Sequence, residues 1–158
     1  MKLIPLTQGQ FAMVDDWNYE WLMQWKWHAH KSKKNESFYA IRSKRINGKR
    51  YRIAMHREIM KTPIGMQTDH RDHNGLNCLE ENLRNCTKGQ NAKNRKPWGR
   101  SRYLGVHYIG IRIVAAIRIN KKQIYLGDFK TEEDAARAYD IAAKKYHGEF
   151  ANLNYPNE

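Results

Sequence analysis

The stretch from residue 68 to residue 94 has the sequence TDHRDHNGLNCLEENLRNCTKGQNAKN, in which an Asp-His pair precedes two spaced asparagines. The pair is Asp69 and His70, and the asparagines are Asn82 and Asn91. A neutral histidine near its usual pKa of about 6.5 can accept a proton from water. Carboxylate and amide oxygens are hard ligands for a divalent cation, which can stabilise charge on a phosphate and on a leaving oxygen. The stretch therefore predicts phosphodiester hydrolysis.

The sequence also predicts roles for other side chains in and near this stretch. We expect a turn at 73–75, where Asn and Gly tolerate positive φ, with His73 facing solvent. His56 is expected to pack beneath the site, with contact to a phosphate as the alternative. Arg71 and Arg84 are candidates to hold the phosphate.

The residues Asp69-His70, Asn82 in Glu-Asn-Leu-Arg-Asn-Cys-Thr, and Asn91 in Gln-Asn-Ala-Lys-Asn resemble the motif of the HNH endonucleases, specifically the phage and intron-encoded homing type. The resemblance implies a β-β-α-metal fold. It implies that His70 is the general base and that Asn82 orients it. It also implies that Asp69 and Asn91 bind one Mg²⁺ or Mn²⁺ ion. Asn91 replaces the second histidine of many relatives, which favours a hard cation over zinc.

The composition of the chain also indicates a nucleic-acid partner. The 158 residues can form one ordinary domain or two small ones. The net charge is +13 and the pI is about 9.8, so a polyanion is the expected partner, with nucleic acid as the first candidate. The family resemblances imply double-stranded DNA. No amphipathic Lys/Trp helix or long apolar run supports a membrane. No apolar signal core is seen at residues 1–5, and we expect the cytoplasm of a bacterial host, with a phage gene as one source.

The two cysteines, Cys78 and Cys86, are expected to be reduced and structural. A disulfide is unneeded in a reducing compartment. A zinc site with the nearby histidines is the alternative, but the chain has no Cys-x-x-Cys pair.

The N-terminal region is expected to fold as strands around a short helix. A strand is predicted near residues 11–14, then a helix, then a second strand. Trp17, Trp21 and Trp25 recur every four residues, which predicts a core-facing helix side, with a base-stacking surface as the alternative.

Residues 38–56 are predicted to form a hairpin around the Asn47-Gly48 turn. Its end is crowded with basic residues, of which Arg42, Arg50 and Arg52 are the candidate phosphate contacts; a merely solvated face is the alternative. A helix is predicted from His56 to Lys61 because proline at 63 disfavours helix just before it. Another is predicted from about Lys88, ending by Pro97. Residues 93–102 are basic and interrupted by Pro and Gly, which predicts domains at 1–97 and 98–158.

The second domain is predicted to be a three-stranded antiparallel sheet packed on one helix. The strands are expected at 103–108, 112–120 and 123–129. The helix is expected to start at a Thr131 cap and to end at Gly148. Its packing face is expected to comprise Ala135, Ala138, Ala142 and Tyr146.

The segments Tyr-Leu-Gly-Val, Val-Ala-Ala-Ile-Arg, Tyr-Leu-Gly-Asp-Phe, Glu-Asp-Ala-Ala-Arg-Ala-Tyr-Asp and Ala-Asn-Leu-Asn-Tyr-Pro, within residues 101–156, resemble the APETALA2/ethylene-response-factor DNA-binding domain. The resemblance implies a sheet that reads base edges in the major groove. The implied contact positions are Leu104, His107, Arg112, Ala116, Arg118, Gln123 and Tyr125. Leu104, His107, Ala116 and Gln123 replace charged residues of the plant proteins, so a different target sequence is expected.

Together these features predict an α+β protein with a β-β-α-metal nuclease domain, N-terminal antiparallel strands and a separate DNA reader. The expected enzyme nicks duplex DNA as a monomer, like a homing endonuclease, and leaves 5′-phosphate and 3′-hydroxyl ends. A non-catalytic DNA-binding regulator is the alternative, and RNA binding is a weaker one. The sequence indicates no protein partner.

Overall fold

A computed structural model describes residues 1–33, 36–97 and 99–158, and the chain divides into two compact units. Unit 1 is Met1–Lys88 and unit 2 is Gly89–Glu158. The chain has small antiparallel sheets and few helices, which is compatible with the predicted α+β class. The boundary between residues 97 and 98 stays a prediction, and Trp98, the first residue of the predicted second domain, lies outside the described residues.

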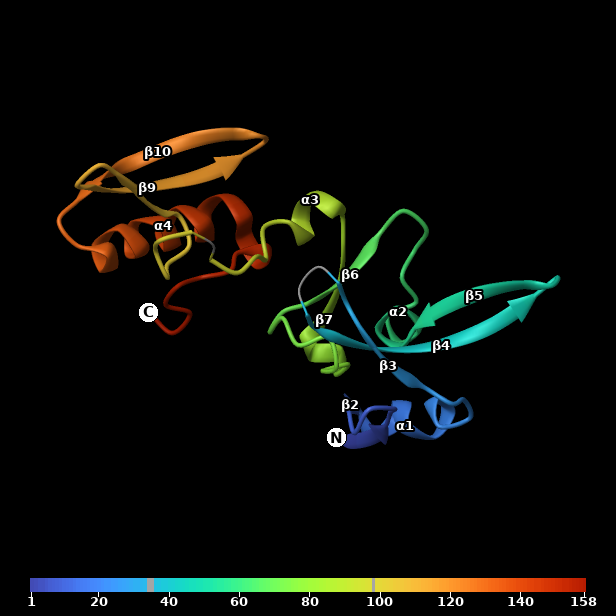
Figure 1. Ribbon diagram of the computed structural model, residues 1–158. Helices are drawn as coiled ribbons and strands as arrows, with labels where there is room; N and C mark the ends of the chain where they lie inside the picture. The colour runs from blue at the N-terminus through green and yellow to red at the C-terminus, as the bar shows by residue number, and fades with distance from the viewer. Residues whose placement is uncertain (34–35, 98) are drawn as a thin grey trace. The chain divides into compact units, whose positions relative to one another are not determined.

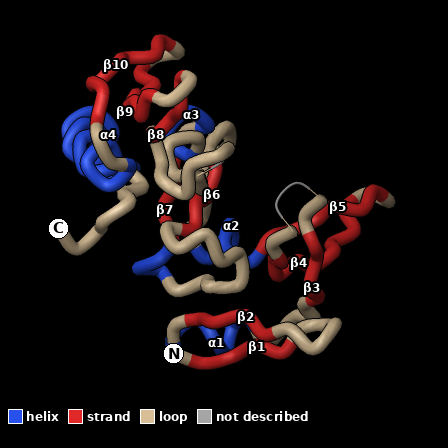
Figure 2. The backbone as a smooth tube through the Cα atoms, turned by 60° about the vertical axis from the view of Figure 1, so that its left-hand side comes forward, coloured by secondary structure: helices blue, strands red, loops and turns tan. Residues whose placement is uncertain are grey.

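Unit 1 is built from short antiparallel strands (Figure 1). Its elements are β1 (Lys2–Pro5), β2 (Phe11–Val14), α1 (Asp16–Leu22), β3 (His28–Lys31), β4 (Phe38–Ile46), β5 (Lys49–Ala54), α2 (Met55–Ile59), β6 (Gln67–His70), a 3-10 turn (Glu80–Asn82), β7 (Leu83–Cys86) and the start of α3 (Lys88–Asn91). β1 pairs with β2, β4 pairs with β3 and β5, and β6 pairs with β7. Figure 2 shows the β1–β2 hairpin beside α1.

The predicted β4–β5 hairpin is confirmed, and its turn has the expected chemistry. Asn47 and Gly48 have φ values of 48° and 74°, and a type I′ turn needs positive φ at both central positions. The helices expected near residues 56 and 88 are α2 and α3, and both are shorter than predicted.

The predicted tryptophan core stripe is wrong for Trp17 and Trp25, whereas Trp21 is partly buried and packs against the core of unit 1 as predicted. α1 ends at Leu22, so Trp25 lies beyond the helix and is 37% exposed. Trp17 is 68% exposed, and its indole N–H donates to the carboxylate of Glu80. The side of α1 that faces the core instead buries Asn18 and Leu22, which are four residues apart and therefore on one helix face.

The core of unit 1 joins the N-terminal strands to the 68–94 stretch. The Met13 N–H donates to the Leu76 carbonyl, and the Cys78 N–H donates to the Met13 carbonyl, both at 2.9 Å. The buried apolar residues of this core are Ile4, Ala12, Val14, Leu22, Trp27, Ala40, Met55, Ile59, Leu76, Cys78 and Leu83. The N-terminal strands are therefore part of the unit that carries Asp69 and His70.

Unit 2 contains the predicted three-stranded antiparallel sheet and its helix. The sheet comprises β8 (Val106–Ile109), β9 (Arg112–Ile119) and β10 (Lys122–Phe129), with β9 in the centre. α4 (Glu132–His147) packs against this sheet, and a 3-10 turn (Gly148–Phe150) follows it (Figure 1). The predicted cap is confirmed because Thr131 Oγ1 accepts the Asp134 N–H at 3.1 Å.

The predicted packing face of α4 needs one correction. Ala135 and Ala142 are buried as expected, but Tyr146 is 43% exposed and Tyr139 takes the aromatic position in the core. The ring of Tyr139 fits because residue 105 is glycine: a Cβ there would lie 1.9 Å from Tyr139 Cδ2.

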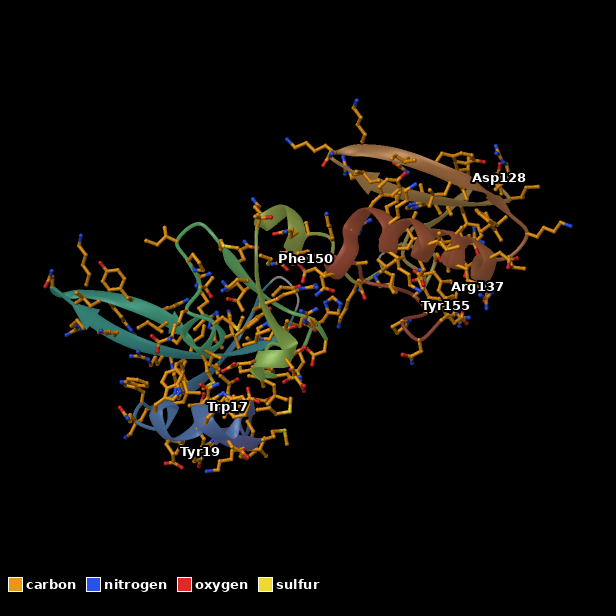
Figure 3. The ribbon with its side chains drawn as sticks, turned by 180° about the vertical axis from the view of Figure 1, so that it is seen from behind. Trp17, Tyr19, Asp128, Arg137, Phe150 and Tyr155 are labelled. Carbon is orange, nitrogen blue, oxygen red and sulfur yellow. The ribbon has the colours of Figure 1, made fainter. Side chains whose placement is uncertain are left out.

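The C-terminal segment is fastened to α4 by Asp140. Its buried carboxylate accepts the backbone N–H groups of Asn154 and Tyr155 at 2.9 and 2.8 Å. The guanidinium of Arg137 lies 5.1 Å from the ring centre of Tyr155 (Figure 3). Across the described ranges, no helix combines the length and the apolar character needed to span a membrane.

Candidate active site

Asp69 and His70 are the last two residues of β6, and both are only 6% exposed. In the β6–β7 hairpin, Asp69 lies opposite Arg84 and His70 lies opposite Leu83. The hairpin connection, residues 71–82, is long and polar. Its two ends are tied together because the Arg71 N–H donates to the Asn82 carbonyl at 2.9 Å.

Asn82 stabilises this connection through its side chain. Its Oδ1 accepts the Asp72 N–H at 3.1 Å, and its Nδ2 donates to Asp72 Oδ1 and to the Asn77 carbonyl at 3.0 and 2.8 Å. Asp72 also accepts from the Asn74 N–H and from Asn77 Nδ2, both at 2.8 Å. Asn82 thus shapes the loop that directly follows His70. Its predicted role in orienting His70 stays a prediction.

In the turn predicted at residues 73–75, the residue with positive φ and the reason for the glycine both differ from the prediction. The positive φ, 62°, belongs to His73. Gly75 is required for close approach instead, because a Cβ there would lie 2.4 Å from the Phe38 carbonyl oxygen and 2.6 Å from the Tyr39 ring.

Asp69 forms a buried ion pair with Arg84. Arg84 Nε and Nη2 donate to Asp69 Oδ2 at 2.9 and 2.7 Å, and the two side chains are 6% and 8% exposed. Charge-assisted bonds of this length hold the carboxylate in a defined orientation. Arg84, a candidate phosphate ligand by sequence, is therefore engaged with the carboxylate.

His70 lies in a cluster of rings with His56 and Tyr39. The ring centres of His56 and His70 are 4.8 Å apart in an edge-to-face arrangement, and Tyr39 is 5.8 Å from each. Burial lowers the pKa of His70 to about 4, although Asp72 and Asp69 act in the opposite direction. Burial, with the neighbouring His70 and Arg57, lowers the pKa of His56 to about 3. Both imidazoles are therefore neutral at pH 7, and His56 packs against the ring of His70 as predicted, while the alternative phosphate contact stays a prediction.

The predicted ligand pair is Asp69 and Asn91. Asn91 is the last residue of α3 and belongs to unit 2, so its role as a ligand stays a prediction. Within the described ranges, no three His, Cys, Asp or Glu side chains gather as a metal site. The predicted donors are a carboxylate and an amide oxygen, and this pair fits Mg²⁺ or Mn²⁺ rather than a soft metal.

The β4–β5 ribbon separates the predicted basic contacts into two groups. Arg50 and Arg52 are exposed and lie on one face. Arg42 lies on the other face and is 8% exposed. It forms an ion pair with Glu58 at 2.8 Å and lies 4.3 Å from the ring centre of Trp25. We therefore correct the assignment of Arg42 to a structural role, because its charge is already compensated.

The sheet of unit 2 places the other predicted DNA contacts on one face. Cross-strand partners share a face: His107 pairs with Val114, Gln123 with Arg118, and Tyr125 with Ala116. α4 packs on the opposite face, against residues such as Ala115 and Ile117. The predicted contacts on the face away from α4 are His107, Arg112, Ala116, Arg118, Gln123 and Tyr125, and of these Ala116 is only 5% exposed. Leu104, by contrast, is 3% exposed and belongs to the core.

On this outer face, Asp128, which is labelled in Figure 3, accepts hydrogen bonds from two of the predicted contacts, Arg112 and Tyr125. Arg112 Nε donates to Asp128 Oδ1 at 2.9 Å, and the Tyr125 hydroxyl donates to the same carboxylate. The hydrogen bond from Arg112 lowers the pKa of Asp128, although burial acts slightly against it. The carboxylate is therefore ionised at neutral pH and offsets one positive charge of the face.

Comparison with known proteins identifies the family. No protein-family model matches the chain. Over 153 residues, however, the chain is 30% identical to an uncharacterized HNH endonuclease of Acanthamoeba polyphaga mimivirus, a match that covers 96% of this chain and 79% of the relative. The chain belongs to the HNH endonuclease family.

This member of the HNH endonuclease family is also similar, over shorter stretches, to plant transcription factors. It is 54% identical over 39 residues to an ethylene-responsive transcription factor-like protein of Arabidopsis thaliana, covering 25% of the chain and 17% of that protein. It is 39% identical over 64 residues to ethylene-responsive transcription factor 3 of Nicotiana tabacum, covering 39% of the chain and 23% of that protein. Both family resemblances seen in the sequence are confirmed, and the placement of the second at residues 101–156 stays a prediction.

The sequence analysis missed two residues of the site, Asp72 and Tyr39, and the pairing of Arg84 with Asp69. Asp72 has a readable signal, since Asp followed two residues later by Asn and then Gly is typical of Asx turns. Tyr39 and the pairing of Arg84 with Asp69 have none, because each depends on strands that are distant in sequence.

Proposed function

We propose that the chain is a metal-dependent endonuclease that cleaves one strand of duplex DNA and leaves 5′-phosphate and 3′-hydroxyl ends. The observation that carries the proposal is His70, a buried and neutral imidazole beside Asp69 at the end of β6, in a chain of the HNH family. A neutral imidazole is the form that accepts a proton.

In this proposal, His70 removes a proton from a water molecule at one of its ring nitrogens, and the water attacks the phosphorus in line. Asn82 and Asp72 hold the loop behind His70. Arg84 orients the Asp69 carboxylate. A Mg²⁺ or Mn²⁺ ion bound by Asp69 and Asn91 would supply charge stabilisation on the phosphate and on the leaving 3′-oxygen. The β-β-α-metal arrangement is part of the proposal.

Unit 2 is proposed to bind duplex DNA through the sheet face that carries His107, Arg112, Arg118, Gln123 and Tyr125. The support is the similarity to ethylene-responsive transcription factors and the location of all five residues on one face. Arg50 and Arg52 of the β4–β5 ribbon are proposed phosphate contacts. We further propose that the protein acts as a monomer, like a homing endonuclease. Its proposed location is the cytoplasm of a bacterial host, and its proposed source is a phage gene.

Nicking of supercoiled plasmid DNA tests the proposal. The expected result is Mg²⁺-dependent or Mn²⁺-dependent relaxation that is abolished by EDTA and lost in His70→Ala. His73→Ala is the matched control, because His73 lies in the same loop and has no assigned role. End-labelling of the product identifies the 5′-phosphate.

A different pattern would support a DNA-binding regulator. The enzyme proposal fails if no metal supports cleavage while duplex DNA is bound tightly. Loss of that binding in Arg118→Ala would then place the function in the sheet of unit 2.

A further inference from the structure

The ring cluster around His70 is assembled from three separate elements. Tyr39 comes from β4, His56 from α2 and His70 from β6, and α2 contacts both strands (Figure 1). The rings of His56 and His70 cross at 74° with their centres 4.8 Å apart. Tyr39 meets the two imidazoles at 60° and 61°. Edge-to-face contacts of this kind are directional and therefore define the orientation of each ring.

The ring of Tyr39 is also in close contact with the loop that follows His70. A Cβ at residue 75 would lie 2.6 Å from Tyr39 Cε1, so the glycine backbone lies directly against the ring. Phe38, the neighbouring residue of β4, packs against the core of unit 1. The Gly75 backbone therefore restricts the movement of the Tyr39 ring.

If His56 served only to fill space, an apolar side chain would be favoured at this position. The Nδ1 of His56 is enclosed and has no hydrogen-bond partner in the described part of the chain. An enclosed polar atom without a partner destabilises a fold, and an apolar side chain would avoid that cost. What the ring of His56 supplies instead is its edge-to-face contact with His70.

We propose that His56, supported by Tyr39, is a positioning residue that holds the His70 imidazole in the orientation needed for proton transfer from water. This inference rests on the proposed nuclease function. His56 acts through His70 and touches neither substrate nor metal ion. The Nδ1 atom of His56 is enclosed, so this atom does not contact a phosphate.

Two substitutions of His56 separate ring shape from ring chemistry. His56→Phe keeps an aromatic ring beside His70, whereas His56→Leu removes it. A misplacement of a catalytic group by about 1 Å can lower a rate about 100-fold. We therefore expect His56→Leu to lower the single-turnover nicking rate constant by about 10- to 100-fold. Since an aromatic ring preserves the contact, His56→Phe should stay within about threefold of wild type. Affinity for plasmid DNA, measured without metal, should change in neither variant.

Ile59→Ala is the matched control for stability. Ile59 lies in the same helix, is buried in the core of unit 1 and lies outside the ring cluster. It should lower the melting temperature without lowering the rate constant at a temperature where the protein is folded. In a His70→Ala background, His56→Leu should have no further effect, because a positioning residue acts only through the group that it positions.

Proton NMR of the His70 ring gives a readout that needs no cleavage. Ring currents from His56 and Tyr39 should displace the His70 ring signals, and His56→Leu should move them while His56→Phe retains most of the displacement. The inference is overturned if His56→Leu cuts at the wild-type rate, if His56→Phe is as slow as His56→Leu, or if the ring signals do not move. If the wild-type protein does not cleave DNA, the nuclease proposal is refuted. The NMR measurement would still show whether His56 determines the orientation of the His70 ring.

Discussion

Replacement of Arg84 by Met should lower the free energy of unfolding of unit 1 by about 3–5 kcal/mol, because it leaves the Asp69 carboxylate buried without its counter-charge. Two hydrogen bonds join the groups, at 2.9 and 2.7 Å, and the side chains are 8% and 6% exposed. Opposite charges about 4 Å apart attract by about 4 kcal/mol at an effective dielectric constant of 20, against about 1 kcal/mol in water. Methionine keeps most of the apolar stem, so the loss reports chiefly on charge.

Urea unfolding followed by tryptophan fluorescence measures this effect in unit 1. Four of the five tryptophans lie between residues 17 and 27 and therefore report on that unit. Lys2→Met is the matched control, because it removes an exposed ion pair with Glu20 at 3.3 Å in the same unit. Such exposed pairs contribute less than about 1 kcal/mol. If Arg84→Met is no more destabilising than Lys2→Met, the buried pair does not hold Asp69 as we infer.

Three further outcomes follow from burial and close packing. An unfolded histidine has a pKa of about 6.5 and folded His70 has one of about 4, so the unfolded chain binds more protons between these values. The contribution of His70 to the free energy of unfolding should therefore be complete above about pH 6.5 and fall by up to about 1.4 kcal/mol per pH unit toward pH 4. His56, with a pKa of about 3, adds a second decrease, so the pH profile measured by urea unfolding should be less steep, but not flat, in His70→Phe. Gly105→Ala should lower the melting temperature far more than Gly65→Ala: both residues have positive φ, but only at residue 105 does a Cβ collide with the Tyr139 ring. Burial raises the pKa of Cys78 to about 12, so mass spectrometry should find no alkylation of this thiol by iodoacetamide until urea unfolds unit 1.

Local patterns predicted the elements that depend on neighbouring residues. The Asn47-Gly48 turn and the Thr131 cap each depend on a few adjacent residues, and both were located correctly. The prediction of a buried tryptophan stripe failed because it depended on the length of the helix and not only on adjacent residues. A spacing of four residues predicts one helix face only while the helix continues, and α1 ends at Leu22.

The prediction that Arg42 contacts a phosphate also failed because it depended on more than adjacent residues. In the sequence Arg42 is one of several basic residues at a hairpin end, but the pairing of β4 with β5 turns it to the face opposite Arg50 and Arg52. There Glu58 and Trp25 enclose it. Cross-strand register decides which charges meet solvent, and one-residue differences in register exchange the two faces.

By itself the sequence determined the HNH family, the Asp69-His70 pair and the sheet-and-helix unit, because motif residues and short-range periodicity are properties of adjacent positions. Only the tertiary structure decided what surrounds those residues. Arg84 meets Asp69 through the register of β6 and β7, and His56 meets His70 through the packing of α2. Such contacts depend on how distant segments fold together to exclude water, and that packing is what pairs the charge of Asp69 and keeps the His70 imidazole neutral.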